Sequence, residues 1–370
     1  MYMKYKLGEI CEIVSGSTPK TSISEYWDGK VKWITPAELK EDTYIIEDSV
    51  RKITEKAVKD TGLTSFPEGT VILSSRAPIG KVAIAGCEMY CNQGFKNLIC
   101  SDKIYNRYLY WFLRGKTKYL ESLGRGATFK EISKQIVANI EIDIPDLCEQ
   151  HKIVRVLERI NKLIGLRQEE SKYLDSLIKA RFVELFIGKG YPTKTVDEVS
   201  LGKGEYGAQS ASIEYDSNRP RYVRITDIKD DGTLNDDIVA SINPDDDEQY
   251  RLEYGDFMFA RMGATVGKTY AFITGNQIFA GYLIRYRLNT KLINPRYLFW
   301  YTKLDEYWDW VKLNQSGAAQ PGINAKKYGS LRIPIPPIEL QQQFAAFVAQ
   351  TDKSKAAIQK SLDETQLLFE

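Results

Sequence analysis

The chain has 370 residues, of which 43% are hydrophobic and 27% are charged, a balance typical of soluble globular proteins. This composition excludes a wholly disordered chain, a collagen-like repeat and a small disulfide-stapled scaffold. The net charge is only +2, from 51 Lys and Arg against 49 Asp and Glu, so the overall basic excess common in nucleic-acid-binding proteins is missing.

The N-terminal segment gives no sign of export. Residues 1–6 (MYMKYK) are not followed by an apolar run, so we predict no secretory signal. The chain also lacks a stretch of about 18 consecutive apolar residues, so we predict no membrane span. We therefore expect a cytoplasmic protein whose cysteines are reduced.

The first half of the chain begins with a turn-rich segment that favours β-strands. Residues 70–73 (TVIL) and 82–85 (VAIA) are predicted strands on either side of a turn at 77–80 (APIG). Residues 107–112 (RYLYWF) predict a short helix with aromatic side chains on a buried face, and 140–144 (IEIDI) predict a returning strand.

A long helix is predicted after Pro145. The pattern is unbroken as far as Phe186, although Gly165 is a potential bend, and residues 188–192 (GKGYP) end it. Roughly 40 helical residues would span about 60 Å. The apolar positions recur at heptad-compatible spacing, namely Ile153, Leu157, Ile160, Ile164, Leu174, Ile178 and Leu185.

The second half of the chain repeats the first. Residues 107–112 return as 296–301 (RYLFWY), at an offset of 189 residues. Four landmarks in one order at nearly one offset predict two copies of a unit of about 190 residues. The other matches are 126–127 (GA) with 317–318, Ile144-Pro145 and Gln150 with Ile335-Pro336 and Gln341, Arg76 and Lys81 with Arg261 and Lys268, and more faintly 92–95 with 279–282.

The second copy predicts the same elements. Strands are expected at 256–259 (DFMF), 270–273 (YAFI) and 331–335 (LRIPI), with a short helix at 296–301. A second long helix, about 45 Å in length, follows Pro337. Its apolar residues are Leu340, Phe344, Phe347, Ile358, Leu362 and Leu368.

Neither long helix can bury its apolar stripe alone. We therefore expect the two helices to pack on each other as an antiparallel coiled coil. The alternative is that each helix folds separately on its own domain. The expected fold class is α/β, more narrowly α+β: two similar globular domains separated by two long helices, with a pseudo-twofold internal repeat.

Two glycine-rich segments resemble nucleotide-binding loops but lack the required context. Residues 202–207 (GKGEYG) match G-x-G-x-x-G, yet a loop is expected after them rather than a helix. Residues 263–269 (GATVGKT) are one residue short of a phosphate loop and precede a predicted strand. We interpret the first as a flexible turn and the second as a hairpin turn that exposes Lys268.

No catalytic constellation stands out in the sequence. Neither Asn-Pro-Pro-Tyr nor Asp-Pro-Pro-Tyr occurs, so the amino-methylating catalytic loop is absent. The acidic run at 245–248 is interpreted as a solvated loop. His151 is the single histidine, and the cysteine spacings disfavour a zinc site. The five cysteines are Cys11, Cys87, Cys91, Cys100 and Cys148. Aromatic residues assigned to packing are Tyr108, Trp111, Tyr297 and Trp300.

The ends of both copies resemble a known family. Residues 316–324 (SGAAQPGIN) followed by 331–343 (LRIPIPPIELQQQ) are similar to the end of a target recognition domain that enters a conserved helix. This pattern is found in specificity (S) subunits of type I restriction–modification enzymes. Residues 126–132 (GATFKEI), 6–10 (KLGEI), 15–19 (SGSTP) and 33–36 (WITP) carry the resemblance in the first copy. The first copy differs at 146–148 (DLC), where two prolines are usual, and has no counterpart of Gln320-Pro321.

The resemblance implies a non-enzymatic reader of double-stranded DNA. It implies recognition domains at 1–145 and 189–335, each binding one half of a bipartite asymmetric site. The helices, at 146–188 and 336–370, would set the spacing and bind two methyltransferase (M) subunits that methylate adenine. Restriction (R) subunits would join for cleavage. This chain would bind no cofactor, while S-adenosylmethionine, ATP and Mg would be held by the partner subunits.

Candidate DNA contacts are side chains in predicted turns. Arg, Asn and Gln read base edges, while Lys and hydroxyl groups hold phosphates. The repeat supports the pairs Arg76/Arg261 and Lys81/Lys268 best, although a surface salt bridge is an equally good reading of each. The candidates are Ser17, Lys20, Ser74, Arg76, Lys81, Arg125 and Lys130 in the first copy and Arg224, Arg261, Lys268, Gln315 and Gln320 in the second.

The local charges are small. Residues 1–145 carry 21 basic and 18 acidic side chains, and residues 189–335 carry 19 of each. We therefore expect tight, specific DNA binding to require the methyltransferase partners. Three alternatives stay open: a specificity subunit whose partner fuses nuclease and methyltransferase, a coiled-coil adaptor with no role in DNA binding, and an enzyme that uses Cys87 or Cys91.

Overall fold

The computed structural model describes residues 2–40, 43–126, 130–242, 248–317 and 321–367. The chain forms two compact units, Met1–Leu166 with Leu362–Glu370, and Arg167–Ser361. Among the described residues, no helix is both long enough and apolar enough to cross a membrane.

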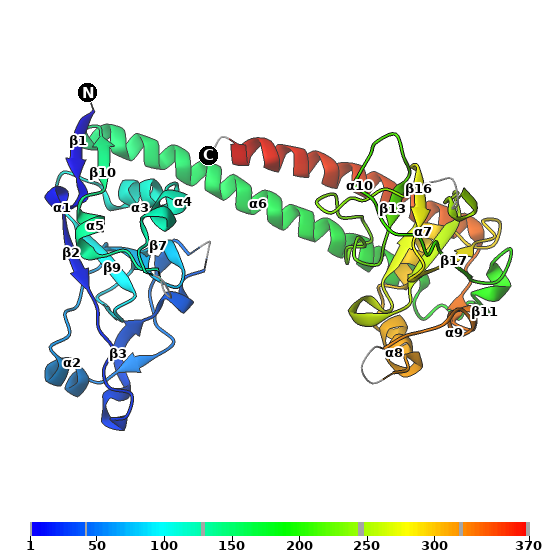
Figure 1. The fold of residues 1–370 in the computed structure, drawn as a ribbon, viewed down its shortest axis with the longest axis horizontal. Helices are drawn as coiled ribbons and strands as arrows, with labels where there is room; N and C mark the ends of the chain where they lie inside the picture. The colour runs from blue at the N-terminus through cyan, green and yellow to red at the C-terminus, as the bar shows by residue number, and fades with distance from the viewer. Residues whose placement is uncertain (1, 41–42, 127–129, 243–247, 318–320, 368–370) are drawn as a thin grey trace. The chain divides into compact units, whose positions relative to one another are not determined.

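The first unit is a β-rich domain followed by the beginning of a long helix (Figure 1). Its elements, in chain order, are β1 (Met3–Lys6), α1 (Leu7–Ile10), β2 (Cys11–Ser15), η1 (Ser24–Tyr26), β3 (Trp27–Ile34), η2 (Pro36–Glu38), β4 (Ile45–Ile46), β5 (Lys52–Ile53), α2 (Glu55–Thr61), β6 (Val71–Ser75), β7 (Ile79–Ala85), β8 (Tyr90–Cys91), β9 (Phe95–Cys100), α3 (Asn106–Arg114), α4 (Thr117–Leu123), α5 (Lys134–Ala138), β10 (Glu141–Ile144) and α6 (Leu147–Phe186).

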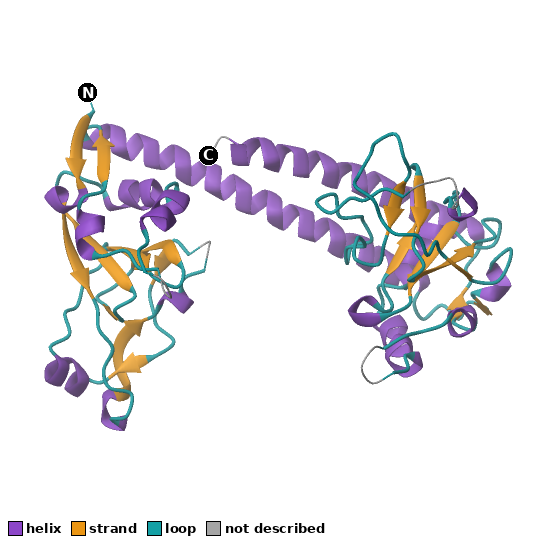
Figure 2. Cartoon of the chain, viewed as in Figure 1, coloured by secondary structure: helices purple, strands orange, loops and turns teal. Residues whose placement is uncertain are grey.

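The second unit repeats this plan with longer loops between its strands (Figure 2). Its elements are β11 (Thr193–Thr195), η3 (Asp197–Val199), β12 (Glu205–Tyr206), β13 (Arg221–Val223), η5 (Glu248–Tyr250), β14 (Asp256–Ala260), η6 (Gly263–Thr265), β15 (Thr269–Ala271), β16 (Gln277–Phe279), β17 (Leu283–Arg287), α7 (Pro295–Tyr301), α8 (Asp305–Asn314), α9 (Ala325–Gly329), β18 (Arg332–Pro334) and α10 (Ile338–Leu367).

A five-stranded sheet forms the centre of the first unit, in the order β2-β9-β6-β7-β4. All five residues of β6 are buried because the strand is covered on both faces. Val71 and Leu73 pack with Leu109 of α3, while Ile72 packs with Phe66 on the other face. The apolar run Val71–Leu73 therefore suits a position that is covered on both faces.

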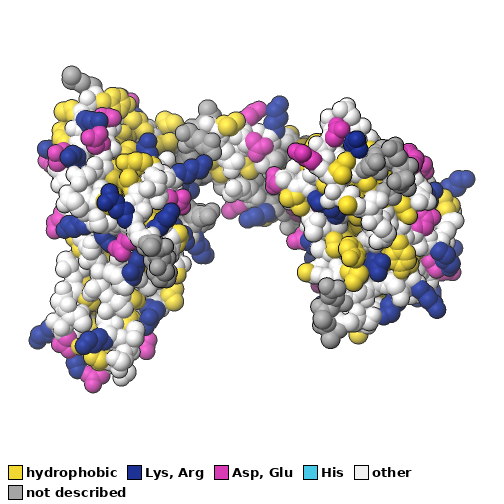
Figure 3. All heavy atoms as spheres, viewed as in Figure 1, with side chains coloured by type: hydrophobic (Ala, Val, Ile, Leu, Met, Phe, Trp, Pro, Cys, Tyr) yellow, Lys and Arg dark blue, Asp and Glu magenta, His cyan; other side chains and the backbone are white. Residues whose placement is uncertain are grey.

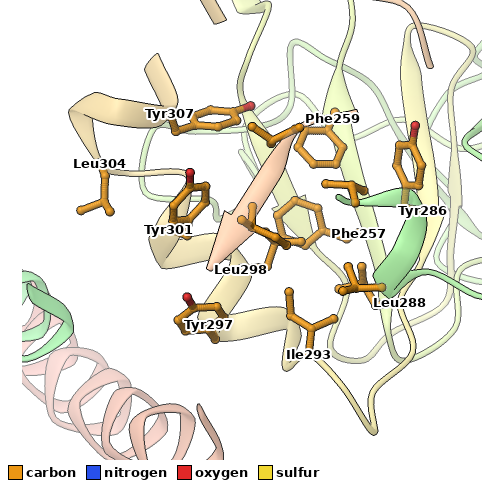
Figure 4. Close-up of a cluster of buried hydrophobic side chains, with 14 of the residues drawn as sticks. Phe257, Phe259, Tyr286, Leu288, Ile293, Tyr297, Leu298, Tyr301, Leu304 and Tyr307 are labelled. Carbon is orange, nitrogen blue, oxygen red and sulfur yellow. The ribbon is translucent and has the colours of Figure 1, made fainter. Parts of the chain in front are cut away.

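The second unit has a matching sheet, β12-β17-β14-β15. Figure 4 shows Phe257 and Phe259 of β14 among aromatic side chains that include Tyr286 and Tyr301. The Phe259 ring lies 5.8 Å from Tyr286 and is perpendicular to it, which is a favourable aromatic arrangement. The cluster also holds Tyr297, so this aromatic side chain serves packing, as predicted. Tyr108, Trp111 and Trp300 likewise lie in or against the two main cores.

A buried glutamine joins each long helix to its own domain. The Gln150 amide accepts a hydrogen bond from the Tyr105 backbone N–H at 2.8 Å and donates to the carbonyls of Lys103 and Pro145 at 3.1 and 2.9 Å. Both Gln150 and its repeat partner Gln341 are fully buried. The repeated glutamine seen in the sequence is thus a structural clamp.

Gln341 makes the same three bonds in the second unit. It accepts from the Asn294 N–H at 2.8 Å and donates to the carbonyls of Leu292 and Pro336 at 3.1 and 2.8 Å. The helices start differently, because the Asp146 carboxylate caps α6 by accepting from Glu149 N–H at 3.0 Å, whereas prolines precede α10. This explains how the first copy can dispense with the two prolines.

The two long helices pack against each other inside the second unit (Figure 1). Phe182 of α6 meets Phe344 of α10 with ring centroids 5.3 Å apart. Farther along, Lys355 pairs with Asp175 at 2.6 Å, and Arg167 donates to the Ser361 carbonyl at 2.7 Å. Residue numbers fall along α10 as they rise along α6, so the pair is antiparallel.

The predicted elements lie close to the observed ones. The long helix ends at Phe186, as expected, and Gly165 does not interrupt it. Gly188 and Gly190 then adopt φ of 71° and 69°, which a glycine tolerates best. One interpretation was wrong: residues 202–207 are not simply a flexible turn, because Glu205 and Tyr206 form β12 on the edge of the sheet.

We predict that Gln341→Leu destabilises the second unit by about 3 kcal/mol, because three backbone groups lose their buried partner. The matched control is Gln342→Leu at the neighbouring, exposed position, which should change stability by less than about 0.5 kcal/mol. Thermal or urea unfolding of the two variants measures the difference. Equal stabilities would contradict the role of the clamp.

Candidate nucleic-acid interface

Two loops meet beside the end of β6 in the first unit. One is the turn between β6 and β7, and the other joins α4 to α5. Ile132 N–H donates to the Ser75 carbonyl at 3.0 Å, and Arg125 and Glu131 exchange two backbone bonds of 3.0 and 2.9 Å. Arg76 is also bridged to Glu131. These backbone bonds fix the loops without using any side chain.

The same pair of loops occurs in the second unit. Ile323 N–H donates to the Arg261 carbonyl at 2.9 Å, and Ser316 and Gly322 exchange bonds of 3.0 and 2.9 Å. Met262 is bridged to Gly322, as Arg76 is to Glu131. Each unit therefore presents one loop pair, which we call the reading loops. Their described residues are 76–80 with 124–126 and 130–131 in the first unit, and 262–267 with 315–317 and 321–322 in the second.

The matching bonds correct the expected equivalence of two arginines. Ser75, not Arg76, occupies the position of Arg261, because these two carbonyls accept the equivalent bonds from Ile132 and Ile323. The sequence-based pair Arg76/Arg261 is thus out of register by one residue. The pair Lys81/Lys268 is in register. Val82, which follows Lys81, faces Leu73, and Thr269, which follows Lys268, faces Phe259 at the equivalent point of the second hairpin.

Ser17 and Lys20 lie in an exposed loop that two tryptophans anchor. The Trp33 indole N–H donates to the Ser17 carbonyl at 3.1 Å, and the Trp27 indole N–H donates to the Lys20 carbonyl at 3.4 Å. Their side chains remain exposed to solvent. Sequence reasoning missed Arg51, which lies 3.9 Å above the Trp27 ring in a cation–π contact.

The other candidates of the first unit differ in accessibility. Arg125 and Lys130 are exposed, and Arg76 is half-buried. The Lys81 ammonium donates to the Leu39 carbonyl at 2.5 Å. Ser74 is fully buried, where its hydroxyl accepts from Lys81 N–H and donates to the Pro78 carbonyl, so we leave Ser74 out of the interface.

In the second unit, two of the basic candidates have acidic partners. Arg224 holds the fully buried Asp227 through several bonds, the shortest at 2.9 Å. Lys268 is 27% exposed and pairs with Asp230 at 2.7 Å, so the hairpin does not present a free lysine as expected. Arg224 therefore neutralises a buried carboxylate, whereas Asp230, the partner of Lys268, is exposed.

The remaining candidates of the second unit are at the reading loops. Arg261 lies 4.7 Å above the Tyr206 ring, which holds its guanidinium in place. Gln315 is exposed at the end of α8. Gln320 falls outside the described residues. Acidic and basic side chains are interspersed on the face of each unit that Figure 3 shows, as the small net charge requires.

Close packing explains three glycines of the two nucleotide-like motifs, Gly204, Gly207 and Gly267. A Cβ on Gly207 would lie 2.4 Å from the Ala280 carbonyl oxygen, and one on Gly204 would lie 2.6 Å from the Tyr286 ring. Gly267 has φ of 87°, and its carbonyl accepts a 2.7 Å bond from the Tyr307 hydroxyl. These glycines allow close approach of backbone to neighbouring elements and do not line a phosphate site.

Cys91 is buried and is not an activated nucleophile. Burial raises the pKa of Cys91 to about 12, so its thiolate is scarce at neutral pH. All five cysteines are free thiols. Within the described part of the chain, no three His, Cys, Asp or Glu side chains are grouped so that they could hold a metal ion.

The repeated loop pair, the two α/β domains and the long helices agree with one family. The chain belongs to the family described as the type I restriction modification DNA specificity domain, which matches residues 1–175 and 193–365. The chain is a specificity subunit of a type I restriction–modification system and not a catalytic subunit.

Relatives cover nearly the whole chain. The specificity subunit of the type I restriction enzyme MjaIX from Methanocaldococcus jannaschii is 29% identical over 367 residues, covering 93% of this chain and 85% of the relative. A crystal structure of an S subunit from M. genitalium covers all of this chain and 94% of its own, with a TM-score of 0.60 and 14% identity. A structure described under complex assembly and conformational transition of the type I R-M system gives a TM-score of 0.63, at 20% identity and with the same coverage.

We predict that Arg224→Ala lowers the stability of the second unit by about 3 kcal/mol, because it leaves the Asp227 carboxylate buried without its cation. Arg125→Ala, at an exposed position, should cost less than about 0.5 kcal/mol. Thermal unfolding of both variants tests this assignment. A stable Arg224→Ala protein would return Arg224 to the list of side chains free for DNA.

We predict that Ellman's reagent at pH 8 modifies the exposed Cys148 quickly and leaves the buried Cys91 unmodified in the folded protein. Mass spectrometry of peptides locates the label, and the unfolded protein is the control in which both should react. Rapid labelling of Cys91 in the folded state would reopen the possibility of a reactive thiol.

Proposed function

We propose that this chain reads a bipartite, asymmetric site in double-stranded DNA, one half with each pair of reading loops. The observation that carries the proposal is the occurrence of the same two loops, held by the same backbone bonds, once in each unit. Two similar but unequal readers on one chain suit two different half-sites.

The side chains at the reading loops have the chemistry that DNA requires. Exposed Arg125 and Lys130 suit phosphates or guanine edges, and Gln315 suits an adenine edge. Arg76 and Arg261 are held at the rims of the hairpins. Ser17, Lys20 and Arg51 form a second exposed group that suits phosphates. Lys81 and Lys268 take part only if DNA displaces their present partners, Leu39 and Asp230.

We further propose that the recognition domains comprise residues 1–145 and 189–335, and that the helices at 146–188 and 336–370 determine the distance between half-sites. Three features of the chain support these boundaries. β10 ends at Ile144, α6 begins at Leu147, and the clamps of Gln150 and Gln341 fix how each helix leaves its domain.

The helices are also the proposed binding surface for two methyltransferase subunits. Several large apolar side chains of α6 are exposed at heptad-compatible positions, an arrangement that favours partner helices. Restriction subunits would then join the complex, and S-adenosylmethionine, ATP and Mg would be bound by the partners. The exposed residues are Val156, Leu163, Leu166, Tyr173 and Leu177.

The test is to co-express the chain with its neighbouring methyltransferase in methylation-free bacteria and to map N6-methyladenine across the genome. A split motif with a fixed gap supports the proposal and gives the sequence that each domain reads. A stable complex without a motif would contradict DNA reading, and failure to form any complex would favour the coiled-coil adaptor. A methyltransferase fused to a nuclease in the neighbouring gene would identify the related system.

We predict that Lys130→Ala weakens DNA binding by the methyltransferase complex about equally on all sequences and lowers the salt slope by about 1, because one phosphate contact is lost. Lys59→Ala, an exposed lysine of α2, is the matched control. Titrations at several salt concentrations measure both quantities. An unchanged slope would place Lys130 outside the interface.

A further inference from the structure

A lysine is buried beneath the reading loops of the first unit. Lys96 is in β9, and its side chain is only 8% exposed. Its ammonium donates to the Ser75 hydroxyl at 3.2 Å and to Glu131 Oε1 at 3.1 Å. A buried lysine is costly unless it is paired, so its placement under these loops requires the carboxylate of Glu131.

Glu131 is at the centre of the same loops. Its backbone is bridged to both Arg76 and Arg125, and it follows the exposed Lys130 directly. Its side chain is 40% exposed, although one oxygen is bonded to the buried lysine. In the described part of the chain, Oε2 has no hydrogen-bond partner. The structure thus anchors one Glu131 carboxylate oxygen on the buried Lys96 ammonium and leaves the side chain partly exposed to solvent.

A carboxylate in this position can accept only certain groups of DNA. It repels phosphates, and it finds no donor on the edge of thymine in either groove. The exocyclic amino groups of cytosine (N4) and adenine (N6) are the donors in the major groove, and a carboxylate pairs characteristically with cytosine N4. Since Lys96 already orients the group, little side-chain entropy is lost when a base binds.

The second unit lacks this arrangement. Lys96 faces Leu73 across the sheet, and the equivalent residue that faces Phe259 is Ile284. Glu131 corresponds to Gly322 in the bridges of the reading loops. A role in reading bases should therefore affect one half of the DNA site and leave the other half unchanged.

We propose that Glu131 is a specificity-determining residue that accepts a hydrogen bond from a base amino group, cytosine N4 in the first place, and that Lys96 is its positioning residue. This inference rests on the proposed function. It adds the chemical group that the first reading loops recognise, and it assigns a functional role to a buried ion pair.

The experiment compares the methylation motif of Glu131→Gln with that of the wild-type complex. The amide keeps the size of the side chain but adds N–H donors, so discrimination at one base pair of one half-site should fall about 10- to 100-fold. The other half-site is the internal control. Glu121→Gln, an exposed carboxylate on the neighbouring α4, is the matched variant and should leave both halves unchanged.

A second pair of variants separates reading from folding. Lys96→Met removes the positioning group and should relax discrimination at the same base pair. Glu131→Asp keeps the charge but shortens its reach, and should also relax discrimination there if Glu131→Gln fails to fold. If the ion pair were purely structural, its loss in these variants would lower the unfolding temperature and leave the methylation motif unchanged. An unchanged motif in these variants overturns the inference, whereas a wild-type complex without any split motif overturns the proposed function itself.

Discussion

The rest of the structure depends on how each long helix is joined to its domain, and a buried glutamine makes this joint. Gln150 and Gln341 each bond one backbone N–H and one carbonyl of the segment before α3 or α7. Each also bonds the carbonyl of a proline that lies between the last strand and the long helix. Side chains of this kind, buried and fully bonded, tolerate little change in orientation. A helix held in this way leaves its domain in a fixed direction, which the proposed role as a spacer between two recognition domains requires.

The reading loops are also held in the same way in both units, but the side chains that they carry differ. Their positions are fixed by backbone bonds that are the same in both units, so the side chains are free to differ. The first unit places the Lys96–Glu131 pair there, while the second places Ile284 and Gly322 at these positions and stacks Arg261 on Tyr206. One scaffold can thus carry two chemistries, as the proposed asymmetric site requires.

The repeat, the strands that flank the hairpins and both long helices could be predicted from the sequence, because they depend on local patterns of apolar residues. Candidate side chains were harder to judge. Lys81 is bonded to Leu39 and Lys268 to Asp230, partners about 40 residues away that no spacing rule identifies. Ser74 is buried by the fold of its own hairpin. Arg76 and Arg261 match in residue type, but backbone hydrogen bonds set the register and pair Arg261 with Ser75.

The central claim is that two separate parts of this chain each read a segment of the same DNA. Hydroxyl-radical footprinting of the assembled methyltransferase complex on its methylation site tests it most directly. Two protected segments with a less protected gap between them are expected, and protection should be lost in only one segment when Arg125 and Lys130 are both replaced by alanine. A single continuous footprint, or equal loss of protection in both segments, would contradict it.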